Sequence, residues 1–271
     1  MINTLFDLTG KTAFITGGGG LLGPKHAEAI IECGGFVILC DIDEKLAKIK
    51  SKELNTKYGR VCSTYVYANV CNKDSLEKAL DKFDKIDILI NNAAKDPKIK
   101  KDESLTNETR FENMSFDYWK DGLDAIVNGT FLCCQIVANK MLKSGSGVIL
   151  NIASDLSVIA PDQRIYRKNV PEEQQPVKPI TYSAAKYAVV GMTKYLAVYF
   201  ADKGIRANCL SPTGVFNDHP DEFVQKLSNI IPMGRMANID EYKGAVAFMC
   251  SNASSYMTGH NLIIDGGKTV W

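Results

Sequence analysis

The stretch TAFITGGGGLLGPKHAEAI, residues 12–30, joins a short apolar run, a cluster of glycines and the start of an amphipathic segment. Gly18, Gly20 and Gly23 have the spacing G-x-G-x-x-G, which links a strand to a helix in many α/β proteins. Glycine permits a tight turn, and the amino end of a helix offers free N–H groups to a phosphate. The stretch therefore predicts a strand, a phosphate-binding loop and a helix. The alternative is a glycine-rich turn that only connects the two elements.

The alternation of short β-rich runs and longer helical segments continues along the chain. Seven strands are predicted at 12–16, 36–40, 61–67, 86–90, 147–152, 205–210 and 261–265. Helices are predicted at about 20–33, 43–57, 73–83, 115–143, 181–203 and 238–250. Strands separated by helices form right-handed crossovers. The sequence thus predicts an α/β, doubly wound Rossmann-like fold, with a seven-stranded, mainly parallel sheet and helices on both faces.

The bulk properties suit a single domain that covers residues 1–271, because no linker-like stretch divides the 271 residues. A net charge of +1 gives no basic field for nucleic acid. The apolar runs look too short for a bilayer and no secretory leader is readable, so a cytoplasmic protein without membrane attachment is expected. Eight cysteines without C-x-x-C spacing and three scattered histidines predict reduced thiols and no metal site.

Asp41 follows the second predicted strand, eighteen positions after Gly23. A carboxylate at this place accepts hydrogen bonds from an adenosine ribose and repels a 2′-phosphate. The glycine loop contains no Lys or Arg that could receive such a phosphate. The sequence therefore favours NAD over NADP as the cofactor. The alternative is that Asp41, like Asp43, only caps the next helix.

Further landmarks follow the glycine loop and Asp41 in a fixed order. They are NNAA (91–94), NIAS (151–154), YSAAK (182–186), SPTG (211–214) and TGHNLIIDGG (258–267). With this ordered set, nearly the whole chain resembles a short-chain dehydrogenase/reductase of the compact, single-domain branch.

The resemblance implies a catalytic set of Ser154, Tyr182 and Lys186. Tyr182 is the expected proton donor and acceptor. Lys186, one helical turn further on, is expected to favour the phenolate and to hold the nicotinamide ribose. Ser154 is expected to donate a hydrogen bond to the substrate oxygen. The structural alternatives are a strand-end hydroxyl, a solvated lysine and an amphipathic core tyrosine.

The same resemblance implies a set of cofactor contacts. Asn69 stands where the family usually has an aspartate, and its amide can still donate and accept at an adenine edge. The expected contacts are Gly17, Gly18, Gly20, Leu22, Gly23, Asp41, Ile42, Asn69, Val70, Asn92, Ala93, Ala94, Tyr182, Lys186, Pro212, Gly214 and Val215.

Two other positions depart from the family pattern or imitate it. Many members carry an asparagine in the central helix, and an ungapped count places Ile126 there, with Asn128 two positions away. The sequence leaves open which of the two fills that place. Tyr166 lies twelve residues after Ser154, but position 170 is valine, so the lysine requirement selects Tyr182 as the acid/base.

The segment between Asp155 and Thr181 is longer than this connection usually is in the family, and it is read as a substrate-loop insertion at about 155–181. Its basic residues Arg164, Arg167 and Lys168 are candidates for binding an anionic substrate group, because Arg suits phosphate geometry. The alternative is a solvated surface loop whose acidic residues partly cancel the charge.

These features predict an NAD-dependent oxidoreductase that transfers hydride between nicotinamide and a secondary alcohol or ketone of a sugar, sugar phosphate or nucleotide sugar. Details of the carboxyl-terminal third resemble members of bacterial carbohydrate pathways, including flagellin modification. The alternatives are an NADP-dependent acyl or steroid-like ketone reductase and a non-catalytic dinucleotide-sensing or scaffold protein. The resemblance also implies a small-molecule substrate and a homotetramer or homodimer.

Overall fold

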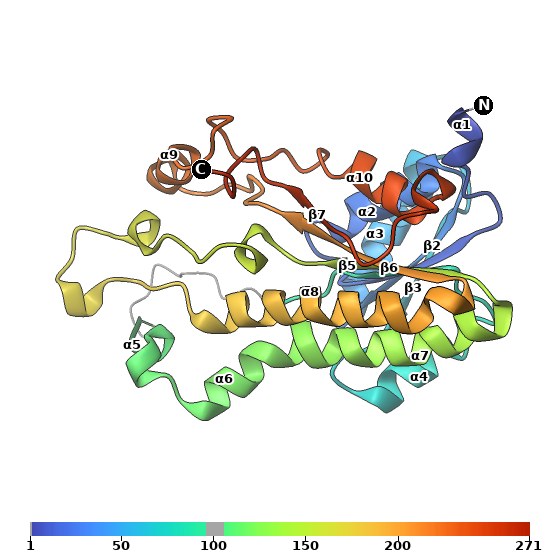
Figure 1. Cartoon of the computed structure of the whole chain (residues 1–271), viewed down its shortest axis with the longest axis horizontal. Coiled ribbons are helices and arrows are strands. Elements are labelled where there is room, and N and C mark those ends of the chain that lie inside the picture. Colours follow the sequence, from blue (N-terminus) through green and yellow to red (C-terminus); the bar gives the residue numbers. More distant parts are fainter. Residues whose placement is uncertain (1, 96–105) are drawn as a thin grey trace.

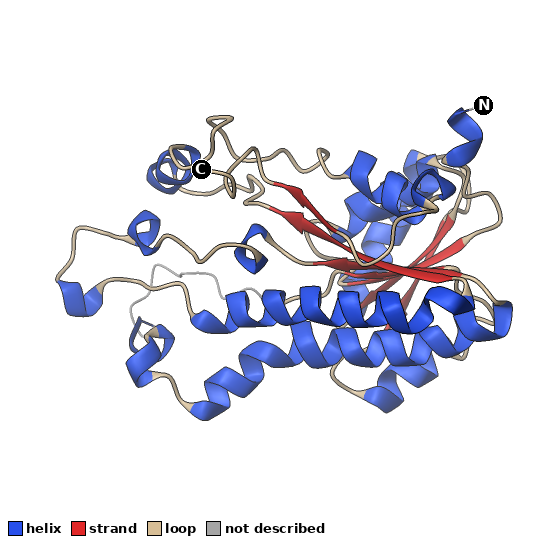
Figure 2. Cartoon of the chain, viewed as in Figure 1, coloured by secondary structure: helices blue, strands red, loops and turns tan. Residues whose placement is uncertain are grey.

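The computed structural model describes residues 2–95 and 106–271, which form a seven-stranded sheet covered by helices on both faces (Figure 1, Figure 2). The strand order is β3-β2-β1-β4-β5-β6-β7, and every pairing is parallel. The predicted doubly wound Rossmann-like fold is confirmed. The strands are β1 (Thr12–Thr16), β2 (Phe36–Asp41), β3 (Ser63–Tyr67), β4 (Ile88–Asn91), β5 (Gly147–Ile152), β6 (Ile205–Pro212) and β7 (Asn261–Ile264).

The helices follow the predicted segments, with shifted ends. The α-helices are α1 (Ile2–Leu5), α2 (Gly23–Glu32), α3 (Glu44–Lys57), α4 (Lys73–Leu80), α5 (Thr106–Thr109), α6 (Phe116–Leu123), α7 (Gly129–Ser144), α8 (Ile180–Phe200), α9 (Asp221–Ser228) and α10 (Lys243–Cys250). The helix predicted from residue 238 begins only at Lys243, and α9 was not predicted. Short helical turns lie at η2 (Phe111–Asn113), η4 (Asp155–Ser157), η5 (Gln163–Tyr166), η6 (Glu172–Gln174), η7 (Ala201–Lys203) and η8 (Asn252–Ser254).

Each face of the sheet packs against its own apolar core. Successive residues of a strand point to opposite faces, so in β1 Ala13 and Ile15 belong to one core and Phe14 to the other. The first core includes residues of α2, α3 and α10, and the second includes residues of α4, α7 and α8. Both faces are therefore covered, which explains why the inner strands β1 and β2 are almost continuously apolar.

The strand order reverses between β1 and β4, because β2 lies on one side of β1 and β4 on the other. In open parallel sheets ligands bind beyond the carboxyl ends of the strands at this reversal. The segments that leave β1, β4 and β5 at this edge are the glycine loop, NNAA and NIAS. The fold thus brings three of the sequence landmarks to one place.

The predicted central helix is continuous but irregular. A π-helical turn, η3 (Asp124–Asn128), joins α6 to α7. Within residues 2–95 and 106–271, this run from Phe116 to Ser144 is the one helix long and apolar enough to cross a membrane by length and composition, contrary to the expectation that no apolar run would suffice. Its buried residues on α7 lie in the core beneath the sheet. This is the packing of a core helix.

Candidate active site

The glycine loop after β1 is too crowded for side chains at several positions. A Cβ on Gly23 would lie 2.3 Å from the carbonyl oxygen of Gly17, and one on Gly18 would lie 2.8 Å from Cβ of Leu39. Gly17 also has a positive φ of 61°, which side chains rarely adopt. The loop therefore presents bare backbone at the amino end of α2, an arrangement that fits a pyrophosphate.

Asn92 and Ala93, which follow β4, hold this loop at the strand reversal. The Asn92 amide donates to the carbonyl oxygens of Thr16 at 3.1 Å and Gly17 at 3.0 Å. The backbone N–H groups of Asn92 and Ala93 both donate to the Thr16 hydroxyl. Ala94 is exposed. The NNAA segment therefore supports the glycine loop, and its small exposed alanine leaves room beside it.

Asp41 lies at the end of β2 and faces the glycine loop. Its carboxylate accepts hydrogen bonds from the backbone N–H of Gly19 at 2.9 Å and of Asp43 at 3.0 Å. It does not cap α3, because the side chain that accepts from Leu46 N–H is that of Asp43. A carboxylate has about four acceptor sites, so two bonds to the backbone leave it able to accept from a ribose.

The other expected cofactor residues line the same edge of the sheet. Ile42 is exposed beside Asp41. Asn69 accepts a hydrogen bond from Cys71 N–H through its side chain, and Val70 packs closely on Gly129. Pro212 ends β6, while the remaining members of the set are Leu22 before α2, Gly20 in the loop, and Gly214 and Val215 after β6.

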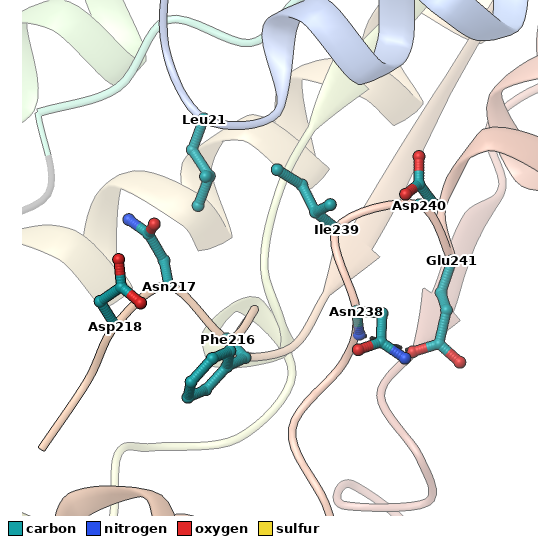
Figure 3. A pocket seen from close by; sticks show the side chains of 8 residues that line it. All are labelled: Leu21, Phe216, Asn217, Asp218, Asn238, Ile239, Asp240 and Glu241. Atoms are coloured by element: carbon teal, nitrogen blue, oxygen red, sulfur yellow. Dashed lines mark hydrogen bonds between the residues drawn. The ribbon is translucent and has the colours of Figure 1, made fainter.

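A pocket of about 690 Å³ opens between the glycine loop and the segments that follow β6. Leu21 extends from the loop toward Asn217, and Ile239 lies across from Leu21 (Figure 3). The lining also includes Phe216, Asp218, Asn238, Asp240 and Glu241. The pocket therefore adjoins the glycine loop at Leu21.

Tyr182 and Lys186 lie in the first two turns of α8. Lys186 is 3% exposed, and its Nζ donates to the carbonyl oxygen of Ile152 at 2.6 Å. The same Nζ lies 5.6 Å from the centroid of the Tyr182 ring. Because Ile152 ends β5 and Ser154 follows it, this bond places the lysine, the tyrosine and the serine at the same end of the sheet. The solvated alternative for Lys186 does not hold.

Ser154 belongs to a buried network that the sequence analysis missed. Its hydroxyl donates to Asp155 Oδ1 at 2.8 Å and accepts from Leu156 N–H at 3.2 Å. Asp155 Oδ2 accepts from the Thr213 hydroxyl at 2.7 Å and from Lys268 Nζ at 2.8 Å. Asp155 and Lys268 form an ion pair with side chains 5% and 8% exposed. Only the acidic residue directly after NIAS and the lysine directly after IDGG hinted at this pair.

Ile126 and Asn128, the two candidates for the central-helix position, have different surroundings. Ile126 is 1% exposed and belongs to an apolar cluster against which Tyr182 packs. The Asn128 amide instead donates to the Asp124 carboxylate at 2.8 Å, one turn away. The π-helical turn, a feature common at functional sites, directs these two side chains differently. An apolar group therefore stands beside the tyrosine.

The predicted anion-binding residues of the insertion lie at the surface. Arg164 pairs with Asp162, with Nη2 and Oδ2 2.7 Å apart, and its side chain is 79% exposed. Arg167 pairs with Glu172 at 4.0 Å. Lys168 is exposed, and its backbone N–H and carbonyl bond the side chain of Gln175. That these three residues bind an anionic substrate group stays a prediction.

Another basic residue of the insertion, Lys178, lies inside. It is 9% exposed, and its Nζ lies 4.6 Å from the centroid of the Tyr182 ring. It was not among the predicted anion-binding residues, and it lies between Pro176 and Pro179. Lys178 is four residues before Tyr182, at the spacing that Lys186 has after it.

A loop that fits a pyrophosphate, an acid at the end of β2 and a tyrosine between two lysines together define a nucleotide-dependent oxidoreductase of the Rossmann type. A family model described as enoyl-(acyl carrier protein) reductase matches residues 22–269, nearly the whole chain. The chain belongs to the short-chain dehydrogenase/reductase family, an oxidoreductase family that uses nicotinamide dinucleotides.

Curated relatives match over almost their full length. The NAD-dependent glycerol dehydrogenase of Listeria innocua is 31% identical over 98% of this chain and 96% of its own. The D-threitol dehydrogenase of Mycolicibacterium smegmatis is 30% identical over 98% of this chain and 95% of its own. A 3-oxoacyl-(acyl-carrier-protein) reductase of Aquifex aeolicus is 31% identical over 96% of this chain and 98% of its own.

Solved structures share the fold. A gluconate 5-dehydrogenase from Burkholderia cenocepacia, in complex with NADP and tartrate, has a TM-score of 0.85 and 27% identity and covers 100% of both chains. A short-chain dehydrogenase from Leptospira borgpetersenii with bound NAD+ has a TM-score of 0.81 and 30% identity, covering 97% of this chain and 94% of its own. These similar proteins include users of both nicotinamide dinucleotides.

Proposed function

We propose that the protein is an NAD-dependent oxidoreductase that interconverts a secondary alcohol and a ketone of a polyol, sugar or sugar acid. The observation that carries the proposal is the position of Tyr182 beside the anchored ammonium of Lys186. A cation next to a phenol stabilises the phenolate, which can then accept the proton of an alcohol. The nicotinamide, when bound, accepts or supplies the hydride. A sensing or scaffold protein would not need this proton-transfer set.

Each catalytic residue then has a physical task. The bond from Lys186 to the Ile152 carbonyl fixes the ammonium beside the ring. Tyr182 moves the proton to or from the substrate oxygen. Ser154 donates to that oxygen once its single hydroxyl proton turns away from Asp155, which accepts it in the structure at 2.8 Å. A fixed polar group near the reacting oxygen stabilises charge that develops there.

The preference for NAD rests on Asp41. Its carboxylate lies against the glycine loop, where a 2′-phosphate would meet a fixed negative charge. The polyol or sugar substrate is supported by relatives named for glycerol, threitol and gluconate. The acyl-reductase alternative predicts the opposite cofactor preference and a thioester substrate.

The test is a substrate screen with two cofactors. The purified protein is mixed with NAD+ or NADP+ and a panel of polyols, aldonates and sugar phosphates, and NADH or NADPH formation is followed by absorbance. We expect turnover with NAD+, and the Asp41→Asn variant should narrow the preference, since it keeps an acceptor for Gly19 N–H but removes the charge. Turnover confined to NADPH and 3-oxoacyl thioesters would contradict the proposal.

We also propose a homotetramer or homodimer in the cytoplasm. Large apolar side chains are exposed along α8, among them Tyr195, Val198 and Tyr199 at 66%, 82% and 53%. Phe131 on the adjacent α7 is 50% exposed, and Val270 and Trp271 at the carboxyl end are exposed as well. Such patches are typical of association surfaces. Light scattering at micromolar concentration should show an oligomer, and a monomer would refute this assembly.

A further inference from the structure

The carboxylate of Asp155 fixes the direction in which the hydroxyl proton of Ser154 points. Its Oδ1 accepts from the Ser154 hydroxyl at 2.8 Å and from Leu156 N–H at 2.8 Å. Its Oδ2 accepts from the Thr213 hydroxyl at 2.7 Å and from Lys268 Nζ at 2.8 Å. A carboxylate has about four acceptor sites and no proton to donate. These four donors therefore fill the carboxylate, and the single proton of Ser154 points at Asp155.

This direction opposes the task of the serine in hydride transfer. A ketone oxygen, or an alcohol oxygen that gains negative charge during the reaction, is stabilised by a donated hydrogen bond. Ser154 has only one proton to donate, so its bond to Asp155 must break first. A hydrogen bond to a charged acceptor is about twice as strong as one between neutral groups. An uncompensated carboxylate at this place would therefore withhold the proton that the substrate oxygen needs.

The ammonium group of Lys268 offsets the charge of this carboxylate. It binds Oδ2, whereas Ser154 binds Oδ1, and the side chains of Asp155 and Lys268 are 5% and 8% exposed. A pair this buried loses much of its hydration and often stabilises a fold no more than apolar side chains do. An effect on the serine explains its position better. In a buried environment the ammonium repels the partial positive charge of the hydroxyl proton and so weakens the bond from Ser154 to Asp155.

A rigid turn brings Lys268 to Asp155, which is 113 positions earlier in the sequence. The carboxylate of Asp265 accepts from the backbone N–H groups of Gly267 at 2.9 Å and Thr269 at 2.7 Å. Gly266 and Gly267 have positive φ values of 65° and 89°, which side chains rarely adopt. The backbone around Lys268 is therefore already fixed in this structure, as expected of a group that positions a catalytic side chain.

We propose that Lys268 is a positioning residue that acts through Asp155, so that the hydroxyl proton of Ser154 can turn to the substrate oxygen. The inference rests on the proposed alcohol–ketone oxidoreductase function and deepens it, because it assigns the group that makes the serine an effective donor. The effect of Lys268 on the reaction passes through Asp155 and Ser154, and this chain of contacts makes it testable.

The kinetic test is a double-mutant cycle of Lys268→Met and Ser154→Ala. The best substrate from the screen is used at pH 8.5, which keeps carboxyl groups ionised. Lys268→Met should lower kcat by about tenfold or more with little change in KM, because the transition state loses the serine donor. In the Ser154→Ala background the same change should leave kcat unaltered, since no proton remains to be released. Equal losses in both backgrounds would overturn the inference.

Three variants separate this effect from damage to the fold. Lys268→Arg keeps the charge and should retain most of the wild-type kcat. Lys243→Met removes another ammonium that pairs with a buried carboxylate, that of Glu28, and should lower the free energy of unfolding without lowering kcat. The neutral double variant Asp155→Asn/Lys268→Met should fold even if Lys268→Met does not, and its kcat should stay close to that of the wild type. A loss in this double variant as large as that in Ser154→Ala would overturn the inference.

Urea unfolding tests the same coupling without turnover. If Lys268 weakens the bond from Ser154 to Asp155, Ser154→Ala should lower the free energy of unfolding more in the Lys268→Met background than in the wild type. In the neutral double variant the decrease should be no larger than in the wild type. These results together with no turnover of any alcohol or ketone would count against the proposed function alone. Equal decreases in the wild-type and Lys268→Met backgrounds, or a larger decrease in the neutral double variant than in the wild type, would overturn the inference.

Discussion

His26 makes the stability of the protein depend on pH in a way that can be calculated. It lies on α2 behind the glycine loop and is 1% exposed. Burial lowers the pKa of the imidazole from 6.5 to about 4, although the side chain of Asn92 nearby acts in the opposite direction. In the unfolded chain the ordinary pKa returns. Between these two values the unfolded state binds more protons than the folded state, so this contribution destabilises the fold as the pH decreases below about 6.5.

The size of the effect follows from the two pKa values. Lowering the pH from 7.5 to 5.0 should reduce the free energy of unfolding by about 2 kcal/mol through this one group. The assay is urea unfolding followed by tryptophan fluorescence at both pH values and one protein concentration. His26→Leu and His26→Gln should each remove about that much of the pH dependence. If the free energy of unfolding of the wild type and of both variants decreases equally between the two pH values, the conclusion that His26 is buried as a neutral imidazole is wrong.

Three further changes probe the loop, the network and the anchor. Gly23→Ala should weaken NADH binding strongly, because the new Cβ would lie 2.3 Å from the carbonyl oxygen of Gly17. A fluorescence titration that gives the wild-type affinity for NADH would refute the claim that the loop has no room for this side chain. Lys268→Met leaves the buried Asp155 carboxylate without its ion-pair partner and should lower the free energy of unfolding by about 3–5 kcal/mol. Lys268→Arg should recover part of this loss. Equal urea midpoints for the wild type and the two variants would contradict a stabilising Asp155–Lys268 ion pair. Lys186→Ala should weaken NADH binding and move the pH–rate profile to higher pH, and an unchanged profile would argue against its action on Tyr182.

The sheet, and the edge of it that carries the candidate site, could be predicted because short local stretches of sequence indicate each strand and loop. Most strands are short runs rich in apolar residues, and the glycine loop predicts both the turn and the start of α2. The crossover rule then orders the strands. Ser154, Tyr182 and Lys186 could be proposed as a set because the family landmarks keep their order along the chain, and the fold brings the end of β5 and the start of α8 together.

The remainder depends on contacts between residues far apart in the sequence. Asp155 and Lys268 are separated by 113 positions, and neither one alone indicates a buried pair. The sequence analysis named Arg164, Arg167 and Lys168 as the candidate anion-binding residues of the insertion. The structure instead buries Lys178, whose backbone is bonded on both sides by the Gln163 side chain. Sequence patterns do not reveal such side-chain to backbone bonds.

The most direct test of the central claim replaces the hydroxyl of Tyr182. Tyr182→Phe keeps the ring and its packing, so the variant should fold and still bind NADH. With the best substrate from the screen, its kcat should fall by at least about a hundredfold, the usual loss for a general acid/base. Tyr166→Phe is the matched control: Tyr166 packs on Phe223 of α9, and the variant should keep most of the activity. A folded Tyr182→Phe variant that turns over at the wild-type rate would contradict the account.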